Sequence, residues 1–122
     1  MCPHPFVHIE LSSLDREASG KFYHELFGWE VTQLPDMNYA TFATAEGSPG
    51  GGFNPITPDA PSGTILPYVY TEDIKASLEK VVKLGGQVLT QPAPIKGVGL
   101  FALFKDPSGN KLALLEMFEE EK

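Results

Sequence analysis

The residues whose types and spacing could do chemistry are His8 and Glu10, which lie two positions apart in an alternating apolar segment. Side chains two apart on a β-strand point to the same face. His8 and Glu10 are therefore predicted to face away from their apolar neighbours Val7, Ile9 and Leu11. An imidazole beside a carboxylate can act as a general base or as a hydrogen-bonding pair for a substrate. The alternative is a polar pair that no longer has a function.

A second candidate group lies in the later segment Ile65–Tyr70, where Leu66, Tyr68 and Tyr70 alternate on one predicted face. Tyrosine rings with hydroxyl tips can line a site for a planar or aliphatic ligand. They can equally fill such a space in place of a ligand, because tyrosine is commonly half-buried. Four further residues are candidates for a lining, with a facing that the sequence leaves ambiguous: Tyr39, Thr41, Phe101 and Leu103.

An internal repeat positions these groups, because each half of the chain runs from an alternating segment through an aspartate into a helix-period segment that ends at glycine. Asp15 and Gly28 are separated by the same 13 residues as Asp73 and Gly86. The aspartates are predicted to cap helix N-termini and the glycines to end the helices in the left-handed conformation. Two apolar stripes are predicted to be the buried helix faces: Ala18, Phe22 and Leu26 in the first half, and Ile74, Leu78, Val81 and Val82 in the second.

Short strand-like segments follow each helix, at 30–34, 39–44 and 51–56 and then at 87–91, 99–104 and 111–116. Each half is thus predicted to be a βαβββ module, in an α+β fold whose two sheets pair around a central trough. We expect a single domain over 1–122, with modules at about 5–56 and 65–116. A Gly/Pro-rich linker at 57–64 and a solvated acidic tail at 117–122 complete it.

The charge balance limits the kinds of partner expected for the chain, which has 9 Lys and Arg, 16 Asp and Glu and a net charge of −7. No basic stripe is present, so neither nucleic acid nor an anionic membrane surface is an expected partner. No apolar run approaches the roughly 20 residues of a transmembrane helix. The single cysteine, Cys2, allows no internal disulfide and fits a reducing compartment. A soluble, cytoplasmic protein is expected, with a preference for cationic or neutral ligands.

Four segments together resemble the vicinal oxygen chelate superfamily, the group of glyoxalase I, bleomycin-resistance proteins and extradiol dioxygenases. They are HIELSSLDREASGKFYHELFGWEV, GGG, YVYTEDIKASLEKVVKLGGQVL and VGLFALFKDPSGNKLALLE. The resemblance covers nearly the whole chain and implies a glyoxalase-like fold. In the enzymes of this group a divalent metal binds two adjacent substrate oxygens and stabilises an enolate or a similar anion.

The resemblance also places the metal-ligand positions of the superfamily on this sequence. His8 occupies the first, whereas Leu66 and Ala113 occupy two others and have no donor atoms. The remaining position falls in or beside the run 50–53, which offers no ligand. Glu116 lies close to Ala113 in sequence, but a register shift would be needed to bring it to the same place. One ligand of four is too few for a metal that usually wants three protein donors.

The leading hypothesis is therefore a superfamily member that binds a small organic molecule in the inter-module cavity without a metal cofactor. His8, Glu10, Tyr68 and Tyr70 would contact that ligand. The alternative is a metal-dependent lyase, isomerase or dioxygenase, resembling lactoylglutathione lyase, in which His8 with Glu10 or Glu116 holds a divalent ion and His8 and Glu10 are the catalytic candidates. A third hypothesis is a non-catalytic accessory domain. The resemblance further implies a homodimer, with or without exchange of modules.

Overall fold

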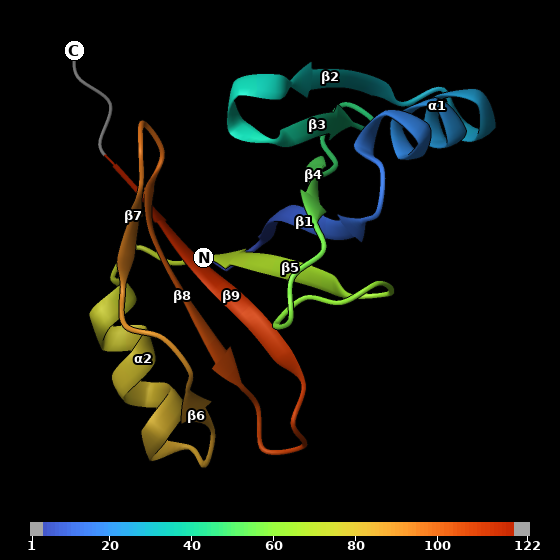
Figure 1. The fold of residues 1–122 in the computed structure, drawn as a ribbon. Coiled ribbons are helices and arrows are strands. Elements are labelled where there is room, and N and C mark those ends of the chain that lie inside the picture. The colour runs from blue at the N-terminus through green and yellow to red at the C-terminus, as the bar shows by residue number, and fades with distance from the viewer. Residues whose placement is uncertain (1–3, 119–122) are drawn as a thin grey trace. The chain divides into compact units, whose positions relative to one another are not determined.

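The computed structural model describes residues 4–118, which form two compact units. The first unit contains residues 7–66, and the second contains residues 4–6 and 67–118. Figure 1 shows the order of helices and strands along the chain. Each unit has one helix and a short sheet of its own, so the α+β fold with a repeated module is confirmed. Of the acidic tail predicted at 117–122, Met117 is instead the last residue of a strand, and residues 119–122, like Cys2, lie outside the described residues.

The first unit is a four-stranded sheet with α1 on one face. In the sheet, the order is β2-β3-β4-β1, with β1 parallel to β4 and the other pairs antiparallel. Its elements are β1 (Phe6–Ser13), α1 (Arg16–Phe27), β2 (Glu30–Leu34), a short 3-10 helix (Pro35–Met37), β3 (Tyr39–Ala43) and β4 (Gly51–Pro55). The three strands predicted after the helix are present to within one residue at each end.

Local sequence signals set both ends of α1. The Asp15 carboxylate accepts hydrogen bonds from the backbone N–H groups of Glu17 and Ala18, and Gly28 ends the helix in the left-handed conformation at φ 78°. The predicted buried stripe is wrong, however, because Phe22 is 59% exposed. Ala18 and Leu26 are exposed as well, and the helix packs instead through Gly20 and Tyr23. Aromatic stacking of Tyr23 on Trp29 and Phe53 favours that face.

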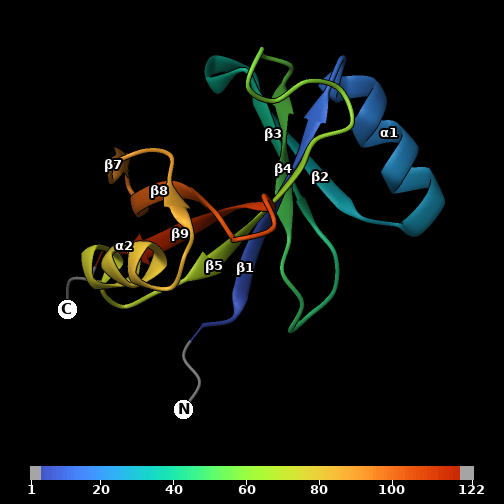
Figure 2. The same cartoon turned by 90° about the horizontal axis from the view of Figure 1, so that it is seen from below.

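The second unit repeats this plan with strand order β5-β9-β8-β6 and an additional strand, β7, paired with β8. Its elements are β5 (Ile65–Tyr70), α2 (Ile74–Lys83), β6 (Gln87–Val88), β7 (Ala93–Ile95), β8 (Gly99–Lys105) and β9 (Lys111–Met117). Figures 1 and 2 show α2 lying along β8 and β9. The segment predicted as one strand over 87–91 is thus a two-residue strand, and the three-residue β7 was not predicted.

Helix α2 starts at the predicted cap, where the Asp73 carboxylate accepts from the Ala76 N–H. Its end differs by one residue from the prediction, because Gly85 and not Gly86 has the positive φ, at 97°. Gly86 is needed for a different reason, since a Cβ there would lie 2.6 Å from the backbone carbonyl oxygen of Lys105 and 2.9 Å from a Val81 methyl carbon. Ile74 and Leu78 are buried as predicted, whereas Val82 is 61% exposed.

Each unit has its apolar core between its helix and the helix-facing side of its sheet. The core of the first unit contains Ala40, Phe42 and Phe53, with Leu11 packed against them. The buried residues in the core of the second unit are Ile74, Leu78, Ala102 and Leu114. Because side chains alternate along a strand, the other face of each sheet carries the remaining residues of the same strands. Within residues 4–118, no helix has the length and apolar character needed to cross a membrane.

Candidate functional site

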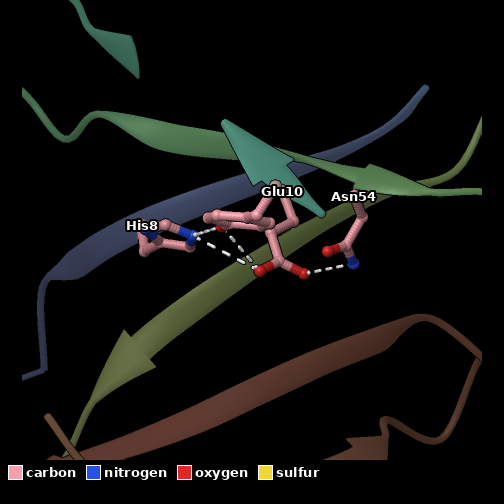
Figure 3. A network of polar contacts seen from close by, with 4 residues as sticks. His8, Glu10 and Asn54 are labelled. Atoms are coloured by element: carbon pink, nitrogen blue, oxygen red, sulfur yellow. Dashed lines mark hydrogen bonds and ion pairs between the residues drawn. The ribbon is translucent and has the colours of Figure 1, made fainter. Parts of the chain in front are cut away.

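A network of polar side chains lies on the face of the first sheet that α1 does not cover (Figure 3). The Tyr39 hydroxyl is 2.9 Å from His8 Nε2 and donates to Glu10 Oε2 at 2.9 Å. Asn54 Nδ2 donates to the other carboxylate oxygen of Glu10 at 2.8 Å. His8 Nε2 and Glu10 Oε2 are 3.5 Å apart, so the pair becomes an ion pair when His8 is protonated. Three strands, β1, β3 and β4, therefore contribute to one cluster.

Strand register explains why these residues meet. Glu10 pairs with Gly52 across β1 and β4, and Thr41 pairs with the same Gly52 across β3 and β4. Positions two residues away share that face, which brings His8, Tyr39 and Asn54 to it. The predicted shared face of His8 and Glu10 thus follows from the register, and the opposite face carries Leu11, in contact with the core.

Gly52 lets the Tyr39 ring reach the middle of the network. A Cβ at position 52 would meet the Oη, Cζ and Cε2 atoms of Tyr39, which are its three nearest heavy atoms. The ring therefore occupies the space that a side chain at position 52 would need. This space is the reason that a residue on β3 bonds to two residues on β1, with β4 between them.

The network is partly shielded from water, with the His8 side chain 28% exposed and that of Glu10 14% exposed. A carboxylate at such burial is costly unless it is hydrogen-bonded. The two donors from Tyr39 and Asn54 meet this requirement. The cluster is therefore a preorganised polar surface, with an imidazole and a carboxylate held in fixed positions.

In the second unit the corresponding face is apolar and aromatic. Tyr68 pairs with Ala113 across β5 and β9, and its ring centre lies 6.5 Å from that of Phe101. Leu103 pairs with the same Ala113. Because Ala102 and Leu114 belong to the helix-side core, Phe101 and Leu103 share the Tyr68 face. This resolves the facing that the sequence left ambiguous. Tyr70 follows on the same face, paired with Leu115.

The donor set does not fit the metal centre that the resemblance implies. The registers show that Gly52 and Ala113 hold equivalent positions in the two repeats, opposite Glu10 and Tyr68, and neither has a donor side chain. Leu66 has none either. Within residues 4–118, no group of three or more His, Cys, Asp or Glu side chains is placed to hold a metal ion. His8 and Glu10 alone fall short of the three protein donors usual at such centres.

Glu116 has a structural contact that removes it from any shared ligand set with His8. Its Oε1 accepts a hydrogen bond of 2.9 Å from the backbone N–H of Ile74, the first residue of α2. It also alternates with Leu114, which belongs to the helix-side core, and so lies on the face opposite Ala113. The prediction that Glu116 could help to hold an ion is wrong for this reason.

A turn at Asp106 forms the β8–β9 hairpin. Its carboxylate accepts hydrogen bonds from the backbone N–H groups of Ser108 and Asn110 and from the Asn110 side chain. These bonds, first of all that from the Asn110 side chain, lower the pKa of Asp106 below its usual value. Gly109 supplies the positive φ of 93° that the turn requires.

Two members of the network were missed or undervalued in the sequence. Asn54 carried no motif, and only the β1–β4 register connects it to Glu10. Tyr39 was a candidate for the lining but not for the centre of a network. The glycine run at 50–52 contained the available signal, because a glycine in a strand interior often marks a close approach of another group to the backbone.

Comparison with known proteins identifies the family. The model of the Glyoxalase/Bleomycin resistance protein/Dioxygenase superfamily matches residues 6–114. The chain belongs to this superfamily. CFP32 of Mycobacterium tuberculosis, named provisionally as a glyoxylase, is 32% identical over 87% of this chain and 43% of its own length. A glyoxylase-like domain-containing protein of Didymella fabae is 32% identical, over 87% of this chain and 88% of its own.

Solved structures of this superfamily have the same fold. A Streptomyces coelicolor methylmalonyl-CoA epimerase in complex with 2-nitronate-propionyl-CoA superposes with a TM-score of 0.70, at 19% identity and over 97% of each chain. That identity supports a shared fold and no shared activity. The chain spans less than half of the first curated relatives that it matches, with 43% coverage of CFP32.

Proposed function

We propose that this superfamily member binds a small organic molecule without a divalent metal. A polar part of the ligand contacts His8 and Glu10, and an apolar or aromatic part contacts Tyr68 and Tyr70. The net charge of −7 favours a cationic or neutral ligand over an anion. A single domain made of two repeats, as expected from the sequence, is part of the proposal.

The observation that carries the proposal is the hydrogen-bonded cluster of His8, Tyr39, Glu10 and Asn54. A partly buried polar network on the sheet face opposite α1 is expensive to keep for packing alone, because apolar side chains would serve that purpose at lower desolvation cost. Fixed hydrogen-bonding groups beside apolar surface are the usual composition of small-molecule sites.

The first experiment is a thermal-shift screen of the purified chain with a panel of aromatic amines, neutral aromatics and acyl thioesters, in the presence and absence of a chelator. A ligand at about 100 times its Kd stabilises the folded state by about 2.7 kcal/mol. We expect a stabilising ligand whose effect the chelator does not change. A panel without any shift, together with a shift caused by a divalent ion alone, would refute the proposal.

Variants then test which residues contact that ligand. His8→Ala and Tyr68→Ala are each expected to weaken binding at least tenfold, about 1.4 kcal/mol. His24→Ala is the matched histidine control, because His24 is exposed and bonds only to the Trp29 carbonyl among the described residues. Weaker binding of the same ligand in both variants would support a role for both residues in binding it. Weaker binding in only one of the two variants would refute the proposal that both residues contact the ligand.

A second candidate function, a metal-dependent lyase, isomerase or dioxygenase, is favoured by the closeness of His8 and Glu10, at 3.5 Å. Imidazole and carboxylate donors suit a divalent ion, and water would have to complete the coordination. Elemental analysis of protein purified without a histidine tag decides between the two. Stoichiometric metal that is lost in His8→Ala would establish the second function and refute the first.

The proposal includes a homodimer in the cytoplasm. The curated relative CFP32 is more than twice the span matched here, since the chain covers 43% of it, so two copies of this chain would approach its length. The lone cysteine fits a reducing compartment. Sedimentation at concentrations around the ligand Kd tests the dimer, and a monomer throughout would refute it.

A further inference from the structure

The geometry points to Tyr39 as the positioning residue of this site. We propose that its hydroxyl fixes the orientation and tautomer of His8 and also holds Glu10. Position 52 must then be glycine, because the Tyr39 ring passes over it. This inference deepens the proposed function, on which it rests for the role of the positioned pair in ligand binding. The positioning itself is a property of the free protein.

The first step follows from counting hydrogens. A tyrosine hydroxyl has one hydrogen, and a carboxylate can only accept. The hydrogen of Tyr39 goes to Glu10 Oε2, so the oxygen of the same hydroxyl must accept from His8 Nε2. Neutral His8 therefore carries its proton on Nε2. A ligand or metal that approaches Nε2 meets an N–H group and not a lone pair, and must first displace Tyr39.

The second step concerns the glycine. All three atoms nearest to a Cβ at position 52 belong to Tyr39. Backbone conformation is not the constraint, because Gly52 is outside the positive-φ region that favours glycine. Alanine at this position would therefore push the Tyr39 ring aside and break its bonds to His8 and Glu10. The neighbouring Gly51 differs, since a Cβ there would strike the backbone carbonyl oxygen of Ile9, which cannot swing away.

The second unit provides an internal comparison. Phe101 holds the position equivalent to Tyr39. Tyr39 lies two residues before Thr41, the partner of Gly52, and Phe101 lies two residues before Leu103, the partner of Ala113. The ring there has no hydroxyl, and its centre lies 6.5 Å from that of Tyr68 in a tilted pair. The repeat that has a Cβ at the small position thus lacks the hydrogen-bonding ring. This supports a link between Gly52 and the reach of Tyr39.

Nitrogen-15 NMR of the histidine side chains tests the first step without any ligand. At about pH 8.5, where an ordinary histidine is neutral, wild-type His8 is expected to show the Nε2–H tautomer. Tyr39→Phe keeps the ring but removes the hydroxyl, and should shift the His8 Nε2 resonance. Tyr23→Phe, in the aromatic core, is the matched control and should leave it unchanged. An Nδ1–H tautomer in the wild type, or an unchanged Nε2 resonance in Tyr39→Phe, would overturn the proposal.

A double-mutant cycle tests the second step. Gly52→Ala should lower the urea midpoint of the wild-type protein and have much less effect in a Tyr39→Ala background, where the ring is absent. Gly51→Ala should lower the midpoint equally in both backgrounds. An equal loss for Gly52→Ala in both backgrounds would show that the glycine serves something other than Tyr39. If Gly52→Ala does not fold in the wild-type background, folding of the double variant supports the proposal and its failure overturns it.

These outcomes are separable from those of the proposed function. If the NMR and the cycle agree with the proposal but no small molecule binds, the ligand hypothesis fails and the positioning of His8 stands. If a ligand binds through His8 but Tyr39→Phe changes neither the His8 resonance nor the affinity, the positioning fails and the binding function stands.

Discussion

The contact between Glu116 and the start of α2 gives a test that separates a structural role from a metal-binding one. Glu116 lies on β9, and its Oε1 accepts from the Ile74 N–H at 2.9 Å. Sequence reasoning had associated the same residue with an ion. We consider Glu116→Ala, which removes the acceptor, and Glu116→Gln, which keeps an oxygen but removes the charge.

The expected magnitude follows from the groups left without partners. The first N–H groups of a helix have no intrahelical acceptors. Asp73 accepts from Ala76 but the Ile74 N–H depends on Glu116, and Ile74 is 1% exposed, so water is a poor replacement. Loss of the acceptor should lower the free energy of unfolding by about 1–2 kcal/mol. Loss of the charge alone should cost about 0.5 kcal/mol through the helix dipole.

Urea unfolding measured by circular dichroism is the assay. Glu79→Ala is the control, because Glu79 is exposed on α2 and has no side-chain partner within residues 4–118; its unfolding free energy should stay within about 0.5 kcal/mol of the wild type. Ligand affinity should be unchanged in all three variants. An unfolding free energy in Glu116→Ala equal to that of the wild type, combined with loss of ligand or metal, would refute the assignment of Glu116 as a helix cap.

Three further predictions concern the fold. Phe53→Ala should lower the unfolding free energy by about 3–4 kcal/mol, because Phe53 is 1% exposed, and urea unfolding measures this. Phe22→Ala should lower the free energy of unfolding by less than about 1 kcal/mol and Tyr23→Ala by about 3 kcal/mol, since Phe22 is 59% exposed while Tyr23 stacks in the core. Equal losses would mean that the face predicted from sequence is buried after all. The folded-state pKa of Asp106 is lowered, so its contribution to stability is present above the unfolded pKa and lost as pH falls through the folded one. Asn110→Ala should therefore reduce the loss of melting temperature on acidification.

The sequence predicted those features that depend on a few neighbouring residues. The caps Asp15 and Asp73 and the left-handed Gly28 follow from local backbone chemistry, and each is where the spacing placed it. Alternation placed His8 and Glu10 on one strand face for the same reason. The end of α2 was off by one because a glycine at either position can adopt a positive φ. Gly85 is the one that does, while Gly86 is required by the close approach of the Lys105 carbonyl oxygen.

Features that depend on tertiary packing could not be predicted. Helix α1 has two apolar faces at helical spacing, and the aromatic partners of Tyr23 decide which one is buried. Strand β7 was missed because its three residues include Pro94, which is poorly suited to a central strand and is accommodated here beside β8. Asn54 and Tyr39 reach Glu10 only through the strand register and through the missing side chain of Gly52.

The two repeats preserve geometry while they exchange polar for apolar side chains, and this exchange bears on the ligand. An offset of 58 residues relates Glu10 to Tyr68, and the registers relate Asn54 to Leu115 and Tyr39 to Phe101. The face of the first sheet opposite α1 therefore presents hydrogen-bonding groups, and the face of the second sheet opposite α2 presents aromatic rings and aliphatic carbons, with Tyr68 6% exposed. At these positions the second repeat has no His, Asp or Glu side chain. The polar contacts that we propose for a ligand therefore belong to the first face, where the Glu10 side chain is 14% exposed and accepts hydrogen bonds from Tyr39 and Asn54; a carboxylate at that burial is costly without such donors.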